Sequence, residues 1–476
     1  MLRKECLDMR QKRTVRGLAL ALIFVLLFAA CAAPAQQEEP TGGGRMALVD
    51  QPQNQEASPA RSENPAAEDE TALSGIGSIG QTSVQNTSAA RTHNFRNSTP
   101  RTQRVTGEVR GVWISFLEYD HLLRGRTQEQ FTANIRRVLD NSAALGLNTV
   151  IVQVRPFADA IYPSAYFPWS QFVTGTEGVA PNFDPLAIMV DEAHARGMRF
   201  EAWINPYRIR AAGSTVPLSA NNQATRWINE GNSAVIRYNG VISYNPASPA
   251  ARQLIVNGVR ELVQNYSIDA IHIDDYFYPT TSAGFDAASF QAYRNGGGTL
   301  SLGDWRRQNV ETLLREMYAA IKAEDPRVEF GISPQSRIDY NFNNLYLDVR
   351  KISSTPGYTD YIMPQIYFGF NHATQPFQRV LEEWEAIVDP QHVRLYIGLA
   401  AYKSGVVDSW AGTAGQNEWI NNADLLRRQV EASRRVSGYN GFVLFRYDSL
   451  FNPSQSVASI VQREYNNLRA LLQQGR

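Results

Sequence analysis

The sequence predicts an α/β fold in which eight parallel strands, each followed by a helix, close into a barrel. From Val109 onward, short runs rich in β-branched and aromatic residues alternate with amphipathic helical patterns, and such alternation is typical of βαβ units around a parallel sheet. There are eight runs over about 365 residues, which fits a (β/α)8 TIM barrel with long loops. The alternative, an open doubly wound sheet, usually carries a glycine-rich phosphate loop, and we find none in the sequence.

The expected strands, in chain order, are 109–116, 148–155, 199–205, 269–275, 328–333, 360–367, 394–400 and 441–447. Three helices between them carry start signals, which are Thr127 with Gln130, Asp184-Pro185 and Ser248-Pro249. Gly146 and Gly197 mark the ends of the first two. A fourth helix is marked by an apolar stripe through Val310, Leu313, Leu314, Met317 and Ile321. The long loops 206–246 and 279–305 follow the third and fourth strands, so we expect them to shape any cleft.

The composition argues against several classes of function. The chain has 476 residues, and 46 Lys and Arg balance 46 Asp and Glu, which argues against nucleic-acid binding. Both cysteines, Cys6 and Cys31, precede the expected barrel, so the barrel has neither a disulfide nor a thiol nucleophile. The six histidines show no HxH or HExxH spacing, so we expect no metal site and no cofactor.

The N-terminus is typical of an export signal. A basic start precedes an uncharged, largely apolar run from Gly17 to Ala30, too short for a comfortable transmembrane helix. The run leads into Cys31 and resembles the bacterial lipobox, with Phe28 where Leu or Val is usual. A plain secretory signal is the alternative.

We therefore expect three regions in the chain. Residues 1–30 form a lipoprotein signal peptide, and residues 31–105 form a disordered linker because they lack sustained apolar periodicity. Residues 106–476 form the barrel domain. This organisation predicts an extracytoplasmic protein of the cell envelope, held to a membrane by a lipid on Cys31.

Polar residues gather at the ends of the expected strands. The working site of such a barrel lies at the C-terminal ends of its strands, and alternation indicates which side chains face the axis. On the fourth strand Ile271 and Ile273 should pack against helices, which leaves His272 and Asp274 facing inward. The corresponding residues elsewhere are Trp113, Gln153, Arg155, Glu201, Trp203, Asn205, Ser333, Gln335, Gln365 and Tyr367. Burying so many polar groups is costly unless they pair with each other or with a ligand, so they predict a substrate-binding cleft.

The adjacent carboxylates Asp274 and Asp275 are the sharpest local feature. Like charges so close raise one pKa, which suits a carboxyl group that must donate a proton. Alternatively, one Asp is functional and the other caps the following turn. We expect Asp274 to stay ionised beside His272 and Arg155. Asp275 at the rim, next to the substrate-binding Tyr276, is then the acid.

Glu201 and His272 leave alternatives open. Glu201 is either a further catalytic carboxylate or a buried structural partner of Arg155 or His272. For His272, we favour a buried histidine with hydrogen-bonded ring nitrogens at the substrate cleft over a role as catalytic base.

Five segments carry a resemblance to a known family. They are EVRGVWIS (108–115), GLNTVIVQVRPFADAIYPS (146–164), FDPLAIMVDEAHARGMRFEAWINPYRI (183–209), IHIDDYFYP (271–279) and YIMPQIYF (361–368). Together they resemble the bacterial glycosyl-hydrolase-like family ten, which includes a divisome-localised hydrolase of peptidoglycan glycan strands. The resemblance covers about residues 105–450 and implies a TIM barrel that hydrolyses peptidoglycan glycan.

A second similarity concerns the fourth strand. Residues 269–276 resemble the DxxDxDxE motif of chitinases, with Asp269 and Asp274 at the first and third aspartates. His272 and Tyr276 replace the second aspartate and the acid glutamate, so that acid is not transferred. The adjacent Asp pair instead resembles that of O-GlcNAc-removing hexosaminidases, in which one Asp orients the acetamido group and its neighbour is the acid.

These observations predict a glycoside hydrolase that acts on N-acetylated cell-wall glycan through Asp274 and Asp275. The nucleophile is either the sugar's own N-acetyl group or a carboxylate pair completed by Glu201. Two alternatives stay open: a non-catalytic glycan-binding lipoprotein, and a hydrolase of another polysaccharide.

The anchor can be tested by Cys31→Ser, because Cys31 is the only cysteine that follows the apolar run. We expect the variant to leave the membrane fraction or to remain unprocessed, as measured by fractionation and immunoblotting. One acyl chain holds weakly, so the expectation assumes the several chains of a bacterial lipoprotein. An unchanged membrane fraction would contradict the prediction.

Overall fold

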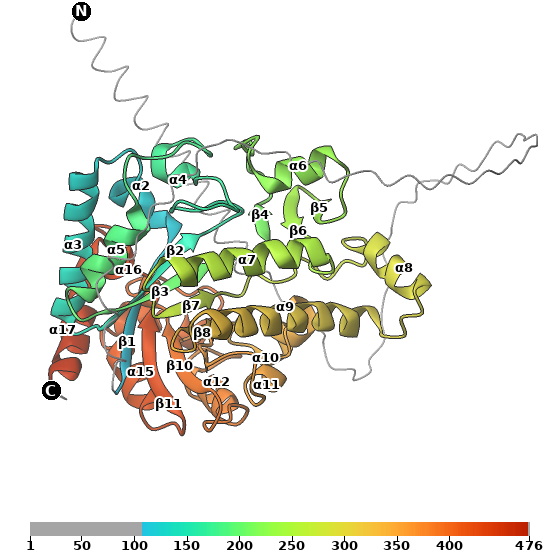
Figure 1. Cartoon of the computed structure of the whole chain (residues 1–476). Helices are drawn as coiled ribbons and strands as arrows, with labels where there is room; N and C mark the ends of the chain where they lie inside the picture. Colours follow the sequence, from blue (N-terminus) through green and yellow to red (C-terminus); the bar gives the residue numbers. More distant parts are fainter. Residues whose placement is uncertain (1–106, 475–476) are drawn as a thin grey trace, which may run out of the picture. The chain divides into compact units, whose positions relative to one another are not determined.

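The computed structural model describes residues 107–474, and in it the predicted barrel is confirmed. Eight parallel strands close in the order β1-β11-β10-β9-β8-β7-β3-β2 (Figure 1). Their bounds are β1 Val109–Ile114, β2 Thr149–Arg155, β3 Arg199–Ile204, β7 Ala270–Ile273, β8 Glu329–Ile332, β9 Tyr361–Ile362, β10 Arg394–Leu399 and β11 Tyr439–Leu444. Each corresponds to one of the eight expected runs.

The expected helix signals also act as predicted. The longer helices are α3 Gln128–Leu145, α5 Pro185–His194, α7 Pro249–Asn265, α8 Ala287–Asn295, α9 Leu302–Glu324, α12 Phe377–Glu385, α15 Leu425–Ser433 and α17 Ala458–Gln473. Thr127 forms the capping box with Gln130, and Gly146 ends α3 in the left-handed region at φ 104°. Asp184 and Ser248 cap α5 and α7. Figure 1 shows α7 and α9 side by side on one flank of the barrel.

Short helical turns lie in the loops. They are η1 Phe116–Glu118, α2 Tyr119–Leu122, α4 Gln171–Thr174, α6 Gln223–Asn229, α10 Ile338–Tyr340, η2 Asn341–Leu345, α11 Val349–Ile352, η3 Ala401–Lys403, α13 Gly412–Gly415, α14 Glu418–Asn421 and α16 Tyr447–Phe451. Three of them, η1, η3 and α16, begin within three residues of the end of a barrel strand, so they lie at the face of the barrel where the strands end.

Two strands differ most from the prediction, whereas the other six keep their bounds to within two residues. The run 360–367 keeps only the two residues of β9, because Pro364 has no N–H to continue the ladder. The eighth strand begins and ends earlier than expected, at Tyr439 and Leu444.

The predicted loop 206–246 contains a small antiparallel sheet that the sequence analysis missed. Its strands are β4 Arg208–Arg210, β5 Val235–Tyr238 and β6 Val241–Tyr244, in the order β4-β6-β5. Asn239 and Gly240 join β5 to β6 with φ 48° and 80°, as a two-residue hairpin requires. The Asn-Gly pair between alternating apolar residues was therefore an available signal.

The side-chain alternation along the strands matches the prediction on β3 and β7. Ile271 and Ile273 pack in the apolar core between barrel and helices, whereas Trp203 lies in a separate cluster inside the barrel. That inner cluster consists of Val109, Trp113, Ile151, Trp203, Ala270, Tyr361, Met363, Tyr396 and Val443. The barrel is thus filled by side chains and the site must lie at its mouth.

The signal peptide, linker and Cys31 predictions fall outside the described residues. Within residues 107–474, no helix combines the length and apolar character needed to cross a membrane.

Gly331→Ala tests how tightly the barrel interior is packed. A Cβ atom at Gly331 would lie 1.7 Å from Cζ of the Tyr361 ring, and that ring is fully buried. We expect the free energy of unfolding to fall by about 3 kcal/mol or more, because overpacking of this kind displaces the ring or the strand. Urea denaturation measures the loss.

Gly296→Ala is the matched control for that measurement. Gly296 is exposed, has φ −77°, and a Cβ atom there would meet nothing closer than 3.5 Å. Equal stability of the two variants would show that the interior around Tyr361 is loosely packed.

Candidate active site

Asp274 follows β7 directly and lies at the C-terminal mouth of the barrel. It is 5% exposed. Its Oδ2 accepts a hydrogen bond from Nε1 of Trp203 at 3.1 Å, and its Oδ1 accepts from the backbone N–H of Tyr276 at 3.2 Å. Asn205 donates a longer bond to Oδ1 at 3.4 Å. The end of β3 therefore fixes the orientation of this carboxylate.

Asp275 is half-buried and is held from the other side of the mouth. Gln335, in the loop after β8, donates its side-chain N–H to Oδ2 of Asp275. Gln365, which follows β9, also hydrogen-bonds to this carboxylate. The two aspartates thus accept hydrogen bonds from residues at the ends of β3, β7, β8 and β9, as expected for a working site at a barrel mouth.

Burial raises the pKa of both aspartates. For Asp274 burial is the larger cause and the charge of Asp275 the second, and together they raise its pKa to about 7. Burial also raises the pKa of Asp275, although the two glutamine donors oppose the shift. Asp274 therefore remains partly protonated near neutral pH, and the two neighbouring carboxyl groups titrate as a pair.

The expectation that Asp274 stays ionised beside two cations is wrong. Burial lowers the pKa of His272 to about 3, so its ring is neutral. Arg155 points away from the pair. The positive charge that acts on both aspartates comes from Arg208, whose guanidinium stacks 4.1 Å from the ring centroid of Tyr276.

The inward orientation predicted for Arg155 is wrong because β2 contains an irregularity. Beyond Gln153 the register with β3 shifts, so that Arg155 pairs with Ile204, an outward-facing residue of the main core. Its guanidinium stacks 4.3 Å from the ring centroid of Phe167 and donates to the carbonyl oxygen of Asn205 at 3.1 Å. One extra residue moves a side chain to the opposite face of a strand.

His272 is an interior histidine with both ring nitrogens engaged. The indole N–H of Trp113 can only donate, so Nε2 of His272 accepts at 3.3 Å. The hydroxyl of Tyr361 donates its hydrogen bond to Glu201, so Nδ1 of His272 must donate to the Tyr361 oxygen at 3.0 Å. This fixes one tautomer and places His272 beneath the mouth, with no exposed surface.

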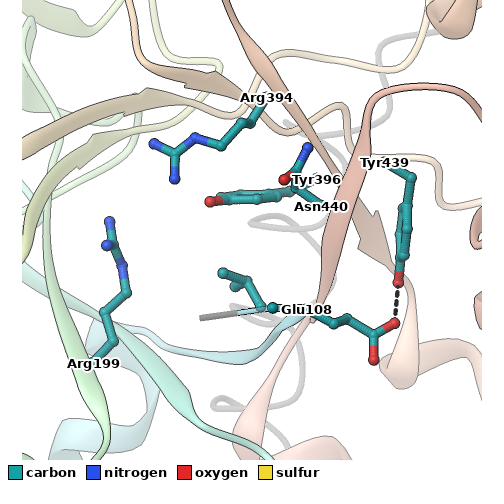
Figure 2. A pocket seen from close by; sticks show the side chains of 8 residues that line it. Glu108, Arg199, Arg394, Tyr396, Tyr439 and Asn440 are labelled. Atoms are coloured by element: carbon teal, nitrogen blue, oxygen red, sulfur yellow. Dashed lines mark hydrogen bonds between the residues drawn. The ribbon is translucent and has the colours of Figure 1, made fainter. Parts of the chain in front are cut away.

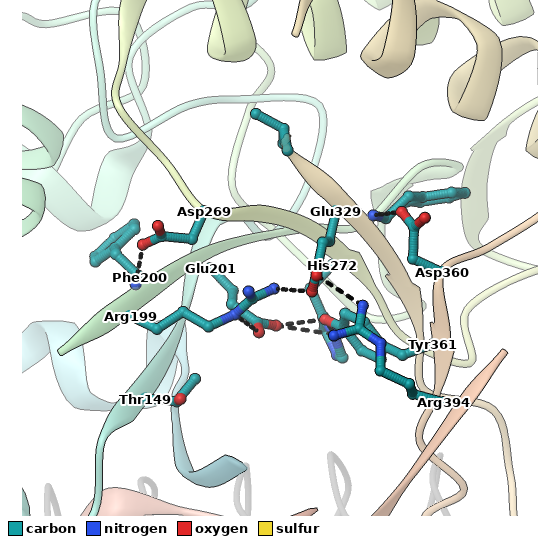
Figure 3. Close-up of polar contacts among 12 residues, drawn as sticks. Thr149, Arg199, Phe200, Glu201, Asp269, His272, Glu329, Asp360, Tyr361 and Arg394 are labelled. Carbon is teal, nitrogen blue, oxygen red and sulfur yellow. Dashed lines mark hydrogen bonds and ion pairs between the residues drawn. The ribbon is translucent and has the colours of Figure 1, made fainter. Parts of the chain in front are cut away.

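Glu201 lies deeper, in an ion-pair network that Figure 3 shows. Its Oε1 accepts from Nε of Arg199 at 2.7 Å. Glu329 accepts from both Arg199, at 2.6 Å, and Arg394, at 2.7 Å. Glu201 is fully buried, and its hydrogen-bond partners are Arg199 and Tyr361 rather than a substrate cleft. This placement favours the structural alternative.

A cavity of 490 Å³ opens at the opposite end of the barrel, where the strands begin (Figure 2). It is lined by Gly107, Glu108, Val109, Arg199, Arg394, Tyr396, Tyr439 and Asn440. It is the larger of the two cavities we describe, yet it lies away from the aspartates. We assign it a structural role, because Arg199 and Arg394 in its wall belong to the ion-pair network and residues at this face of a TIM barrel usually stabilise the fold.

The other predicted site residues lie in three places. Asn205, Tyr276, Gln335 and Gln365 surround the aspartate pair. Trp113 and Gln153 are buried below it, and Gln153 accepts from the backbone N–H of Phe116. Tyr367 lies half-buried and stacks with Phe445, at 5.8 Å between ring centroids.

Sequence reasoning missed Arg208 and Tyr340. Arg208 follows Asn205 by three residues in the loop after β3, so its proximity to the site was a usable signal. Tyr340 sits close enough to Asp275 for that charge to raise its pKa, after the larger effect of burial. Within residues 107–474, no group of three or more His, Cys, Asp or Glu side chains could hold a metal ion.

Comparisons with known proteins identify the family of the chain. The sequence profile named Glycosyl hydrolase-like 10 matches residues 108–412. Glycosyl hydrolase YngK of Bacillus subtilis (strain 168) is 38% identical over 320 residues, covering 62% of this chain but only 61% of YngK. Glycosyl hydrolase DigH of Escherichia coli (strain K12) is 33% identical over 408 residues, covering 77% of this chain and 89% of DigH.

One solved structure supports the fold. The glycoside hydrolase domain of PgaB (BpsB) from Bordetella bronchiseptica superimposes with a TM-score of 0.50 at 13% identity, covering 77% of this chain and 99% of that one. At this level of identity the likeness concerns the fold alone.

The raised pKa of Asp274 predicts a pH-dependent stability. The folded protein keeps a proton on Asp274 up to about pH 7, whereas the unfolded chain releases it near the ordinary value of 3.8. The folded state therefore loses stability as pH rises from about 4 to 7, by at most about 4 kcal/mol. Asp274→Asn removes this titration, so we expect its thermal stability relative to the native protein to improve over that range and then level off.

Asp120→Asn serves as the control, because the Asp120 side chain is 60% exposed on the surface. Thermal unfolding of all three proteins at pH 4, 5.5, 7 and 8 provides the comparison. A stability difference for Asp274→Asn that does not change with pH would show that Asp274 titrates normally.

Proposed function

Because the chain belongs to the glycosyl hydrolase-like 10 family, and so to the glycoside hydrolase class of enzymes, we propose that it hydrolyses N-acetylated cell-wall glycan such as peptidoglycan strands. The single observation that carries the proposal is the aspartate pair at the barrel mouth, held by Trp203, Asn205, Gln335 and Gln365. Raised pKa values allow this pair to supply a proton near neutral pH.

The two aspartates take different roles in this proposal. Asp274 is the more buried, and among the described residues its Oδ2 accepts one hydrogen bond, from Trp203, so this oxygen can also accept the N–H of a substrate acetamido group. Such a donor favours the ionised form of Asp274 and leaves the shared proton on Asp275. Asp275, half-buried at the rim, then donates that proton to the leaving glycosidic oxygen.

The position of Glu201 supports substrate assistance as the source of the nucleophile. Glu201 is committed to Arg199 and Tyr361 inside the barrel. In the assisted route the carbonyl oxygen of the N-acetyl group attacks the anomeric carbon while Asp275 protonates the leaving oxygen. Asp275 then takes a proton from the water that opens the resulting ring, which returns both aspartates to their starting states.

Aromatic side chains at the mouth suit the apolar faces of sugar rings. Tyr367 stacks with Phe445 and packs edge-on against Tyr402, at 5.7 Å between ring centroids. On the other side of the pair, Tyr276 is covered by Arg208. We propose that these two aromatic groups border the sugar-binding subsites.

The proposed location follows from the N-terminal residues. A lipid on Cys31 and a linker over 31–105 would hold the barrel outside the cytoplasm, within reach of cell-wall glycan.

Asp275→Asn tests the assigned acid. We expect activity on natural glycan to fall by about a hundredfold to ten-thousandfold, which is what general acid catalysis is worth. The loss should be much smaller on an aryl glycoside, whose leaving group needs no proton. Asp274→Asn should impair both substrates alike. Rates are measured with the full-length protein on purified sacculi and on denuded glycan strands, with products identified by mass spectrometry.

Asp339→Asn is the control variant, since the Asp339 side chain is 62% exposed and its ion-pair partner within residues 107–474 is Arg337. Near-normal activity of Asp275→Asn on natural glycan would place the acid elsewhere, and Glu201 would be examined first. Binding of strands by the native protein without any released product would favour a non-catalytic glycan-binding protein. Activity confined to other polysaccharides would overturn the proposed substrate.

A further inference from the structure

A second cavity, of 340 Å³, lies between the loop that follows β2 and the loop that carries α6. Six of the side chains that line it are Tyr166, Phe167, Trp169, Asn221, Gln223 and Arg226. Its lining residues include neither Asp274 and Asp275 nor, among the described residues, any side chain that hydrogen-bonds to them. It is therefore separate from the proposed catalytic centre.

A buried carboxylate fixes one wall of this cavity. Glu261 accepts from the hydroxyl of Ser164 at 2.5 Å and from the backbone N–H of Ala165 at 2.6 Å. The Phe167 ring packs so closely on α7 that a Cβ atom at Gly258 would come within 2.5 Å of it. This wall consists of loop residues, yet it is held in one conformation.

A second buried carboxylate fixes the opposite wall. Glu177 accepts from the backbone N–H of Ser219 at 3.1 Å and from Nδ2 of Asn222 at 2.9 Å, and it pairs with Arg210. Asn222 also donates to the carbonyl oxygen of Ala158 at 2.9 Å, which ties the two loops together. A preformed cavity of this size suits a small ligand, because little ordering is needed on binding.

The chemistry of the lining indicates what that ligand is. Tyr166 is 37% exposed and, with Trp169, offers an aromatic surface for the apolar face of a sugar. Asn221 and Gln223 supply amide groups that can hydrogen-bond to hydroxyl and acetamido groups. Arg226 is exposed and forms no ion pair within residues 107–474, so its guanidinium is free to bind a carboxylate in a bidentate manner.

A series of contacts connects this cavity to the aspartate pair. Asn205 donates to Asp274, and its carbonyl oxygen accepts from Arg155. Arg155 in turn stacks on Phe167, which lines the cavity. These contacts link one wall of the cavity to Asp274. The loops that form the cavity follow β2 and β3, so they leave the barrel at the same end as the aspartate pair.

We propose that this cavity is a secondary glycan-binding site that takes an N-acetylated sugar bearing a carboxylate. The choice of glycan rests on the proposed function, whereas the site itself is defined by the geometry of its own walls. It would hold a long strand on the enzyme while the aspartate pair acts on another part of it, which raises the effective concentration of the strand.

The test uses full-length Asp275→Asn protein, in which turnover is blocked. It is titrated calorimetrically with the N-acetylglucosaminyl-N-acetylmuramic acid disaccharide, which carries a carboxylate, and with uncharged di-N-acetylchitobiose. We expect two binding events per chain for the acidic probe. Arg226→Ala should weaken one of them about tenfold or more, and Tyr166→Ala should weaken the same event for both probes. Arg294→Ala, an exposed arginine on α8, is the control.

The same substitution is then made in the catalytically intact protein. Arg226→Ala should raise KM for long denuded strands several-fold. A single binding event for the acidic probe, or equal affinities in Arg226→Ala and Arg294→Ala, would overturn the secondary site. If binding depends on Arg226 but the native protein releases no product from any strand, the proposed function fails and the site stands. If Asp275→Asn abolishes hydrolysis while Arg226→Ala changes nothing, only the secondary site fails.

Discussion

The polar groups buried inside the barrel must satisfy one another, and the rest of the structure depends on how they do so. Unpaired charges in such a place cost several kcal/mol. Glu329 joins Arg394 to Arg199, Arg199 joins Glu201, and Tyr361 connects Glu201 to His272. A bonded chain thus runs from the start of the strands to the floor of the mouth. It leaves Gly331 as the residue that makes room for Tyr361.

The lack of positive charge on His272 helps to explain why the pKa values of the aspartates are raised. His272 is neutral and hydrogen-bonded at both nitrogens, so it supplies no positive charge to Asp274. Arg208 approaches from the side, and burial outweighs its charge. Two carboxylates that retain a proton near neutral pH destabilise the fold, and such a cost is typical of groups placed for catalysis rather than for stability.

The loops outside the barrel follow a different principle. Glu261 and Glu177 are buried carboxylates, and each accepts a hydrogen bond from a backbone N–H group of a loop. Such contacts hold long connections in one shape without regular structure. The rigid walls of the second cavity result from these contacts, and so does the fixed approach of Phe167 to Arg155.

The sequence by itself determined the eight strands, the caps of α3, α5 and α7, and the Asp274–Asp275 pair with its glutamine and asparagine neighbours. Those features depend on local periodicity, on turn chemistry and on the rule that parallel strands end on one face. Only the tertiary structure decided the side to which Arg155 points, the neutral state of His272, the depth of Glu201 and the part played by Arg208. A register shift against β3 reverses Arg155, and the charge of a buried group depends on neighbours from distant strands, so neither is encoded in a local pattern.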